Sequence, residues 1–283
     1  MLLRKFFFVT SFELYGGVNG LYDYGPPGCA IMANLQQHWR NHFVLHENML
    51  EIGCSSLTPE CVLKTSGHVD RFTDYTVYDA ENGDAFRADK LLEDSIEQLQ
   101  LTDSKADKDY TKQLDQDFNA AGSMNKDELE TALKKYNVTV NNGHALTDVT
   151  TFNLMFKTSI GPTGKLIGYL RPETAQGIFV NFRRLYEYNN RRLPFAAAQI
   201  GNAYRNEISP RGGLLRVREF TMAEIEHFVH PERKQCAKFS SVSSLKTLFW
   251  PAQQQVDGQE GIVLPLHDAV NPGYVATETL GYF

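Results

Sequence analysis

Residues 195–207 read FAAAQIGNAYRNE, and residues 216–228 read RVREFTMAEIEHF. Between these two strand-like runs lies ISPRGGLL, whose Pro210, Gly212 and Gly213 favour a loop over a continued strand. Two such runs joined by a longer loop predict an antiparallel hairpin. We therefore expect the fold to be built around an antiparallel pair of strands.

The parity of the residue number sorts the side chains of this hairpin, because successive side chains on a strand point to opposite faces. One face of the second run carries Arg216, Arg218, Phe220, Met222, Glu224 and Glu226. The other face of that run carries Val217, Thr221, Ala223 and Ile225. On the first run, one parity is shared by Gln199, Arg205 and Glu207.

This mixture of arginines, a ring and carboxylates has two interpretations. It is either a solvent-facing sheet of internal salt bridges, or a polyanion site. In such a site guanidinium groups bind phosphate, the ring stacks on a base, and the carboxylates bind an amine or a metal. Unpaired charges are costly to bury, and the opposite face is apolar. The contrast between the two faces favours the ligand site.

The composition of the chain excludes several classes of protein. Its 283 residues are 42% hydrophobic and 22% charged, which is ordinary for a globular protein, and a net charge of −6 gives no basic field for nucleic acid. The four cysteines form no C-x-x-C pair, which predicts neither a zinc site nor a disulfide framework. The first apolar run, residues 6–9, is too short to cross a membrane. We expect a soluble intracellular protein.

Three regions are predicted along the chain. Residues 1–78 form the first part of a core, with a helix over 31–47 and a strand over 49–57 that ends at Pro59. Residues 79–150 form an acidic, partly helical insertion. Its Asn125 and Glu128 have capping-box spacing, and they precede a helical face of Leu129, Leu133 and Tyr136. Residues 151–283 form the second part of the core, with a helix over 174–189. The mixture predicts an α+β fold with an antiparallel sheet.

Three weaker candidates outside the hairpin do not indicate a function by themselves. GPTGKL at residues 161–166 lacks phosphate-loop spacing, and the glycines at 16, 17 and 20 lack the strand-to-helix context of a dinucleotide site. His68 in Thr-Ser-Gly-His is a candidate catalytic residue, but a lone histidine is more often structural.

The hairpin resembles motif 2 of the class II aminoacyl-tRNA synthetases, and its sequence is most similar to that of the eukaryotic and archaeal type of glycyl-tRNA synthetase. The resemblance extends to YGGVNGLYDYG at 15–25, LKTSGHVD at 63–70 and YLRPETAQG at 169–177. The helix near Trp39 and the strand ending at Pro59 resemble motif 1, which forms the dimer interface in this class. The match covers nearly the whole chain except the acidic insertion, where the family varies.

The resemblance implies a role for each motif 2 residue. Arg205 would be the catalytic arginine that holds the α-phosphate of ATP, with Asn206 and Glu207 beside it. The remaining ATP contacts would come from Arg216, the backbone of Val217, and Phe220, whose ring would stack on adenine.

The carboxylates Glu173 and Glu224 would bind the ammonium group of glycine. The implied reaction is ATP-dependent formation of glycyl-adenylate, with Mg²⁺ accompanying ATP, followed by transfer of glycine to tRNA(Gly). The implied location is the cytoplasm, with a mitochondrial form left open. No metal ligand set is expected in the protein itself.

The family's motif 3 and its C-terminal anticodon-binding domain are not found in the sequence. We therefore expect a partial catalytic domain, incomplete at its C-terminus, that activates glycine poorly on its own. The alternative function is a non-catalytic, synthetase-like binding module or accessory subunit. Retention of Arg205, Phe220, Glu173 and Glu224 together argues against that alternative.

Overall fold

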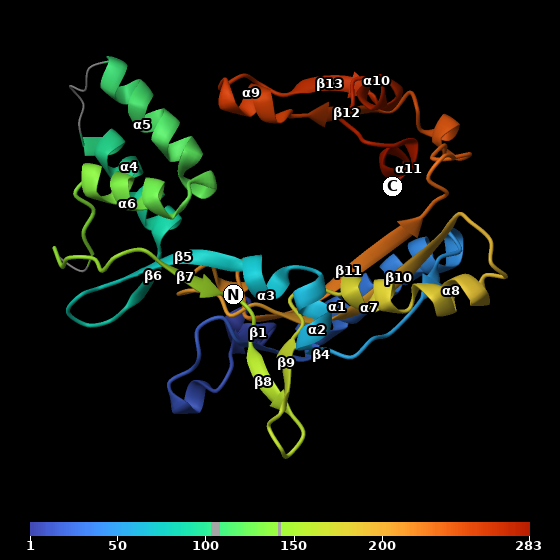
Figure 1. The fold of residues 1–283 in the computed structure, drawn as a ribbon, viewed down its shortest axis with the longest axis horizontal. Coiled ribbons are helices and arrows are strands. Elements are labelled where there is room, and N and C mark those ends of the chain that lie inside the picture. Colours follow the sequence, from blue (N-terminus) through green and yellow to red (C-terminus); the bar gives the residue numbers. More distant parts are fainter. Residues whose placement is uncertain (103–107, 141–142) are drawn as a thin grey trace. The chain divides into compact units, whose positions relative to one another are not determined.

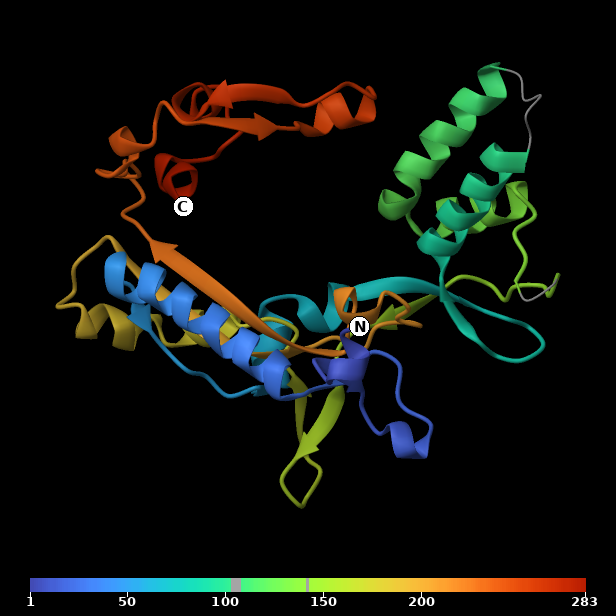
Figure 2. The same cartoon turned by 180° about the vertical axis from the view of Figure 1, so that it is seen from behind.

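The computed structural model describes residues 1–102, 108–140 and 143–283 as a mixture of helices and mostly antiparallel sheets (Figures 1 and 2). The chain divides into two units. The first comprises residues 1–185 and 197–226, and the second comprises residues 186–196 and 227–283. The predicted α+β class is confirmed. In the described parts of the chain, no helix combines the length and apolarity that crossing a membrane requires.

The hairpin is present, with shorter strands than predicted. β10 (Phe195–Tyr204) lies between β11 (Glu219–Phe228) and the short β3 (Leu50–Glu51), which runs parallel to β10. Thr221 bonds to Asn202, and the amide of Arg205 donates to the carbonyl of Arg218. Since the partner number falls as the β10 number rises, the two strands are antiparallel. Because β10 ends at Tyr204 and β11 begins at Glu219, the connection between the strands carries Arg205, Glu207, Arg216 and Arg218.

Two helices lie on opposite faces of this strand pair (Figures 1 and 2). On one face is α1 (Pro26–Trp39), which continues as a π-helical stretch through Arg40–His46; the hydroxyl of Thr221 contacts Met32 in it. On the other face, Glu224 reaches the residue that precedes α7 (Ala175–Val180). Even-numbered and odd-numbered residues of β11 thus face different neighbours, as the parity argument predicted.

The predicted helix over 31–47 is confirmed, but its apolar stripe is not buried in this chain. Ile31 and Leu35 are 58% and 66% exposed. The predicted helix over 174–189 is interrupted at Asn181, which separates α7 from α8 (Phe182–Tyr188). Ile178 and Leu185 are buried, as that pattern indicated.

The single strand predicted over 49–57 is wrong. The segment is split between β3 and β4 (Leu57–Pro59), which belong to different sheets. β4 pairs with β9 (Leu166–Leu170), and β9 pairs with β8 (Lys157–Ile160). The chain leaves the first sheet because residues 52–56 wrap around Arg171 and Gln199: Ser56 accepts from the amide of Arg171, and the amide of Cys54 donates to Gln199. Local β-propensity does not reveal that change of sheet.

The helices α2 (Glu60–Thr65) and α3 (His68–Arg71) follow β4 and carry His68. Near the N-terminus, β1 (Phe8–Thr10) pairs with β2 (Tyr22–Tyr24). The connection between them passes through Gly20, whose φ is 79° and where a Cβ would lie 2.7 Å from Pro210. A side chain at this position would be both strained and obstructed.

The acidic region contains helices around a small apolar core. β5 (Thr73–Tyr78) lies between β6 (Ala85–Arg87) and β7 (Thr150–Asn153), and helices α4 (Ala88–Thr102), α5 (Lys108–Ala120) and α6 (Lys126–Lys135) follow β6. The capping box of Asn125 and Glu128 is confirmed. The core residues include Leu92, Ile96, Leu114, Leu129 and Leu133. The boundaries of this region as a separate domain, 79–150, stay a prediction.

The second unit contains short elements. β12 (Lys246–Phe249) pairs with β13 (Ile262–Pro265), and helices α9 (Ala252–Val256), α10 (Leu266–Val270) and α11 (Glu278–Tyr282) accompany them. Its buried apolar residues among those described are Phe195, Ala196, Phe239, Leu266, Ala269 and Val275.

Candidate active site

The even-numbered residues of β11 form the face on which the candidate site is built. Phe220, Met222 and Glu224 are half-buried, whereas Glu219, Thr221 and Ala223 on the other face are exposed. The structure therefore places the predicted ring, Phe220, and the predicted carboxylate, Glu224, on one half-buried surface. Their neighbours there come from distant parts of the chain.

Arg205 lies just beyond the end of β10. Its Nε donates to the carbonyl oxygen of Pro172 at 3.3 Å. Its guanidinium lies over two aromatic rings, with Cζ 5.4 Å from the ring centre of Phe72 and 5.5 Å from that of Phe220. Cations are attracted to aromatic faces, so contact with the two rings helps to hold this guanidinium in place.

Glu173 follows Pro172 directly. One of its carboxylate oxygens lies 3.3 Å from Nε2 of His68 and accepts a 2.6 Å hydrogen bond from the amide of Gln176. On its other nitrogen, His68 lies 2.9 Å from the hydroxyl of Ser66. The histidine, left above as a lone candidate, is thus an orienting partner of a predicted glycine-binding carboxylate.

Glu224 is anchored by Thr174, the residue that follows Glu173 in the chain. Its Oε2 accepts a hydrogen bond from the amide of Thr174 at 2.9 Å and a second from the Thr174 hydroxyl. The three consecutive residues Pro172, Glu173 and Thr174 thereby connect Arg205 to Glu224. They bring the predicted phosphate-binding and amine-binding groups together.

A third carboxylate belongs to this group. Burial, together with the negative charges of Glu224 and Glu173, raises the pKa of Glu226 above its ordinary value. Parity placed Glu226 on the correct face, but the resemblance assigned it no role. Its membership follows only from the approach of Glu173, which comes from another part of the chain.

A buried arginine, Arg171, holds the backbone that precedes Pro172, Glu173 and Thr174. Arg171 is 5% exposed; its Nε donates to the carbonyl of Asn202, and its Nη1 donates to the carbonyl of Cys54 and to Gln199. Burial lowers the pKa of Arg171, although the negative charge of nearby Glu224 opposes that change. Gln199, fully buried, donates in turn to the carbonyl of Thr174 and fixes the 171–174 segment on β10.

The remaining predicted residues lie on the connection between the strands. Arg216 donates through Nε to Oε2 of Glu207 at 2.9 Å. The amide of Asn206 donates to the carbonyl of Leu154, and Val217 is half-buried beside Arg216. Arg216 and Glu207 thus form an ion pair, and Glu207 follows Arg205 by two residues.

Hollows flank the pair formed by His68 and Glu173. Glu173, Gln176 and Arg171 help to line one pocket of about 320 Å³, which also contains Cys54 and Asn181. A second pocket, of about 300 Å³, is lined by residues 64–68 and 70–72. The described residues contain no cluster of three or more His, Cys, Asp and Glu side chains able to hold a metal ion.

The family model described as the tRNA synthetase class II core domain (G, H, P, S and T) matches residues 165–253, which include the 171–174 segment, β10 and β11. Over this stretch the chain is similar to the class II tRNA synthetases. Along its whole length the chain is similar to glycine–tRNA ligases.

Three relatives show the extent of this similarity. The chain is 55% identical to a glycine–tRNA ligase of Caenorhabditis elegans and 51% identical to that of Drosophila melanogaster, and both matches cover 100% of the chain. It is 46% identical, over 99% of its length, to a putative cytoplasmic glycine–tRNA ligase of Arabidopsis thaliana. The chain spans 38%, 37% and 61% of these relatives, respectively.

Among solved structures, the RNA-binding domain of threonyl-tRNA synthetase from Cryptosporidium parvum Iowa II matches 81% of the chain and 39% of its own length. The TM-score is 0.44 and the sequence identity is 17%.

Two site residues lay outside the motif 2 prediction although a signal for them was present. His68 lies within the LKTSGHVD segment (residues 63–70), which the resemblance had already marked, and Phe72 lies two residues after its end. In the structure this segment lies close to motif 2, where the guanidinium of Arg205 contacts the ring of Phe72, but the distance along the sequence hides that contact. Thr174 gave no signal beyond its place next to Glu173.

Proposed function

We propose that the chain carries the substrate-binding part of a glycine–tRNA ligase active site and binds ATP and glycine side by side. The observation that carries this proposal is the 172–174 segment. Its three consecutive residues contact Arg205, provide Glu173 and anchor Glu224. The proposed phosphate-binding cation, Arg205, and the two proposed amine-binding carboxylates are therefore all held at one short segment of backbone.

The carboxylates select the amino acid by its ammonium group. Glu173 and Glu224 are held in place by His68, Gln176 and Thr174, so their orientation is fixed before a ligand binds. Preorganised charges lose little free energy to reorganisation on binding. Because glycine has no side chain to contact, discrimination rests on the ammonium contacts and on the absence of space at the α-carbon.

The arginines orient ATP. Arg205 would bind the α-phosphate, Arg216 would contact a further part of the nucleotide, and Phe220 would stack on adenine. An oxygen of the glycine carboxylate then attacks the α-phosphorus, and the bond from that phosphorus to the β-phosphate oxygen breaks, so that pyrophosphate leaves. No protein base is needed, because the attacking carboxylate is already ionised at neutral pH.

Magnesium fits this site as a partner of ATP. The described residues offer no ligand cluster for a resident metal, and Mg²⁺ is commonly bound through substrate phosphates. When bound there, it supplies neutralisation of phosphate charge. Arg205 and Arg216 supply the protein's share of that neutralisation.

The proposal extends to tRNA(Gly) as the acceptor of glycine and to a homodimer. The exposed Ile31 and Leu35 on α1 give that helix an apolar stripe suited to a second copy, in agreement with the motif 1 resemblance. The cytoplasm is the proposed location, with a mitochondrial form left open.

Isothermal titration of the chain with glycine, alanine and serine in the presence of Mg²⁺ and a non-hydrolysable ATP analogue tests the proposal. We expect saturable binding of glycine and at least about tenfold weaker binding of alanine. Equal affinity for all three amino acids would contradict the assigned amine site. Glycine-dependent ATP–pyrophosphate exchange then separates a catalytic chain from the non-catalytic alternative, in which both substrates bind without exchange.

A further inference from the structure

The loop between β10 and β11 rests against β6, a strand of the acidic region. We call residues 208–216 the arginine loop. The hydroxyl of Ser209 donates to the carbonyl of Ala85 on β6. The guanidinium of Arg211 lies over the ring of Phe86, the next residue of β6, with Cζ 5.5 Å from the ring centre. The arginine loop is thus attached to β6 at two successive residues.

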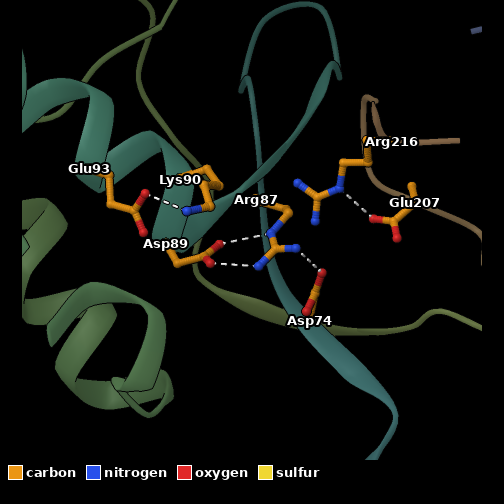
Figure 3. Close-up of polar contacts among 7 residues, drawn as sticks. All are labelled: Asp74, Arg87, Asp89, Lys90, Glu93, Glu207 and Arg216. Atoms are coloured by element: carbon orange, nitrogen blue, oxygen red, sulfur yellow. Dashed lines mark hydrogen bonds and ion pairs between the residues drawn. The ribbon is translucent and has the colours of Figure 1, made fainter. Parts of the chain in front are cut away.

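The third residue of β6, Arg87, is the centre of an ion-pair cluster (Figure 3). Its Nε and Nη2 form a two-point contact with the carboxylate of Asp89, at 3.0 and 2.6 Å. Its Nη1 lies 2.8 Å from Oδ2 of Asp74 on β5. The side chains of Arg87, Asp74 and Asp89 are 18%, 19% and 12% exposed, so the cluster is largely sheltered from solvent.

The Arg216–Glu207 pair of the candidate site faces this cluster. Figure 3 shows the guanidinium of Arg216 extending toward Arg87. Burial raises the pKa of Asp74 above its ordinary value; Glu207 adds to that rise, and Arg87 and Arg216 oppose it. Asp74 therefore experiences the charges of both arginines, although among the described residues only Arg87 forms an ion pair with it.

The contacts of Asp74 are weaker than those of Asp89. Within the described part of the chain, the buried Oδ2 of Asp74 has an ion-pair contact with Arg87 but no aligned hydrogen bond. A carboxylate in that condition attracts any nearby guanidinium. Arg216 is the second guanidinium within its electrostatic reach.

We infer that Arg87 is a positioning residue for Arg216. By neutralising Asp74, it leaves Arg216 paired with Glu207 alone and directed toward the nucleotide site. Without Arg87, Asp74 would draw Arg216 away from that direction. Since Ser209 and Arg211 fix the same loop to Ala85 and Phe86, β6 acts as a support for the whole arginine loop.

This inference rests on the proposed function, because it takes ATP as the ligand of Arg216. It also gives the acidic region a role in the active site. Arg87 and Asp89 lie at the end of β6 and the start of α4, so the support for the arginine loop comes from the region predicted as an insertion.

Two measurements on the full 283-residue chain test the inference. Calorimetry gives the Kd for ATP in the presence of Mg²⁺, and hydrogen–deuterium exchange of the ligand-free chain reports the protection of residues 208–216. The variants are Arg87→Gln, Arg87→Gln combined with Asp74→Asn, and Lys90→Gln. The last is a matched control, because Lys90 pairs with Glu93 on the same helix and makes no contact with the arginine loop among the described interactions.

We expect Arg87→Gln to weaken ATP binding about three- to tenfold and to speed exchange in the arginine loop. Adding Asp74→Asn removes the unpaired carboxylate and should restore the Kd to within about twofold of the parent. Lys90→Gln should change neither measurement. If Arg87→Gln does not fold, Arg87→Lys, which keeps the charge but loses the two-point contact with Asp89, is expected to show a smaller weakening and the same rescue.

Unchanged ATP affinity and unchanged loop exchange in Arg87→Gln would overturn the inference and leave the proposed function standing. Weakening that Asp74→Asn does not relieve would show that Arg87 acts only in local stability, which also overturns it. A parent chain that binds no ATP would instead overturn the proposed function, and with it the ligand assigned to Arg216.

Discussion

The side chain of Glu224 accepts hydrogen bonds from both the amide and the hydroxyl of Thr174, 50 residues earlier in the chain. This contact attaches β11 to the segment that begins α7. Because Thr174 follows Glu173, the same contact sets the separation of two carboxylates. The proposed amine-binding part of the site therefore depends on the contact between Thr174 and Glu224.

Glu224→Gln keeps the shape of the side chain and removes its charge. We expect glycine binding to weaken by about tenfold or more, because charge-assisted hydrogen bonds are stronger than neutral ones. The Kd for ATP should stay the same. Calorimetry with each ligand measures both, and Glu219→Gln, on the exposed face of the same strand, is the control. Equal losses in the two variants would mean that strand charge, and not the site, controls binding.

Arg205→Lys tests the phosphate assignment. Lysine keeps the charge but loses the planar fork that lies over the rings of Phe72 and Phe220. We expect ATP binding to weaken by about tenfold or more, with glycine binding largely retained. Arg184→Lys, at an exposed position of α8, should leave both affinities unchanged. Undiminished ATP binding by Arg205→Lys would remove this residue from the site.

The pH dependence of stability tests the three-carboxylate cluster. The pKa of Glu226 is raised in the folded chain, so the folded state keeps a proton that the unfolded state has released as the pH rises above about 4.5. Stability is therefore lost as the pH rises from the unfolded pKa through the folded one, and Glu226→Gln abolishes that loss. We expect the Tm of Glu226→Gln to exceed that of the parent at pH 8 and to approach it toward pH 4.5. A difference in Tm that does not vary with pH would contradict the assigned cause.

The capping box of α6 gives a prediction about stability alone. Asn125 accepts hydrogen bonds from the amides of Asp127 and Glu128, and Glu128 bonds back to the amide of Asn125. We expect Asn125→Ala to lower the free energy of unfolding by about 1 kcal/mol. Urea unfolding measures the change, and Asn34→Ala, at an exposed position on α1, should cost much less. ATP and glycine affinities should not change, since α6 does not contribute to the candidate site.

Residue patterns in the sequence predicted much of the fold. The alternation along 216–228 predicted which side chains of β11 share a face, and the four-residue step after Ile31 predicted α1. Both patterns are local, with periods of two and about 3.6 residues that a strand and a helix impose on their own side chains. The split of 49–57 into two strands was missed because the deciding contacts, from Cys54 and Ser56, are with Gln199 and Arg171.

The sequence by itself determined the kinds of groups that the chain offers: the arginines, the ring and the carboxylates of the hairpin, and the motifs that link them to class II synthetases. Only the tertiary structure decided how those groups are held. His68 reaches Glu173, Thr174 reaches Glu224, and Arg87 faces Arg216, in each case from a distant part of the chain. The physical reason is that hydrogen bonds and ion pairs depend on distance and direction in space, which a periodic pattern along one segment does not contain.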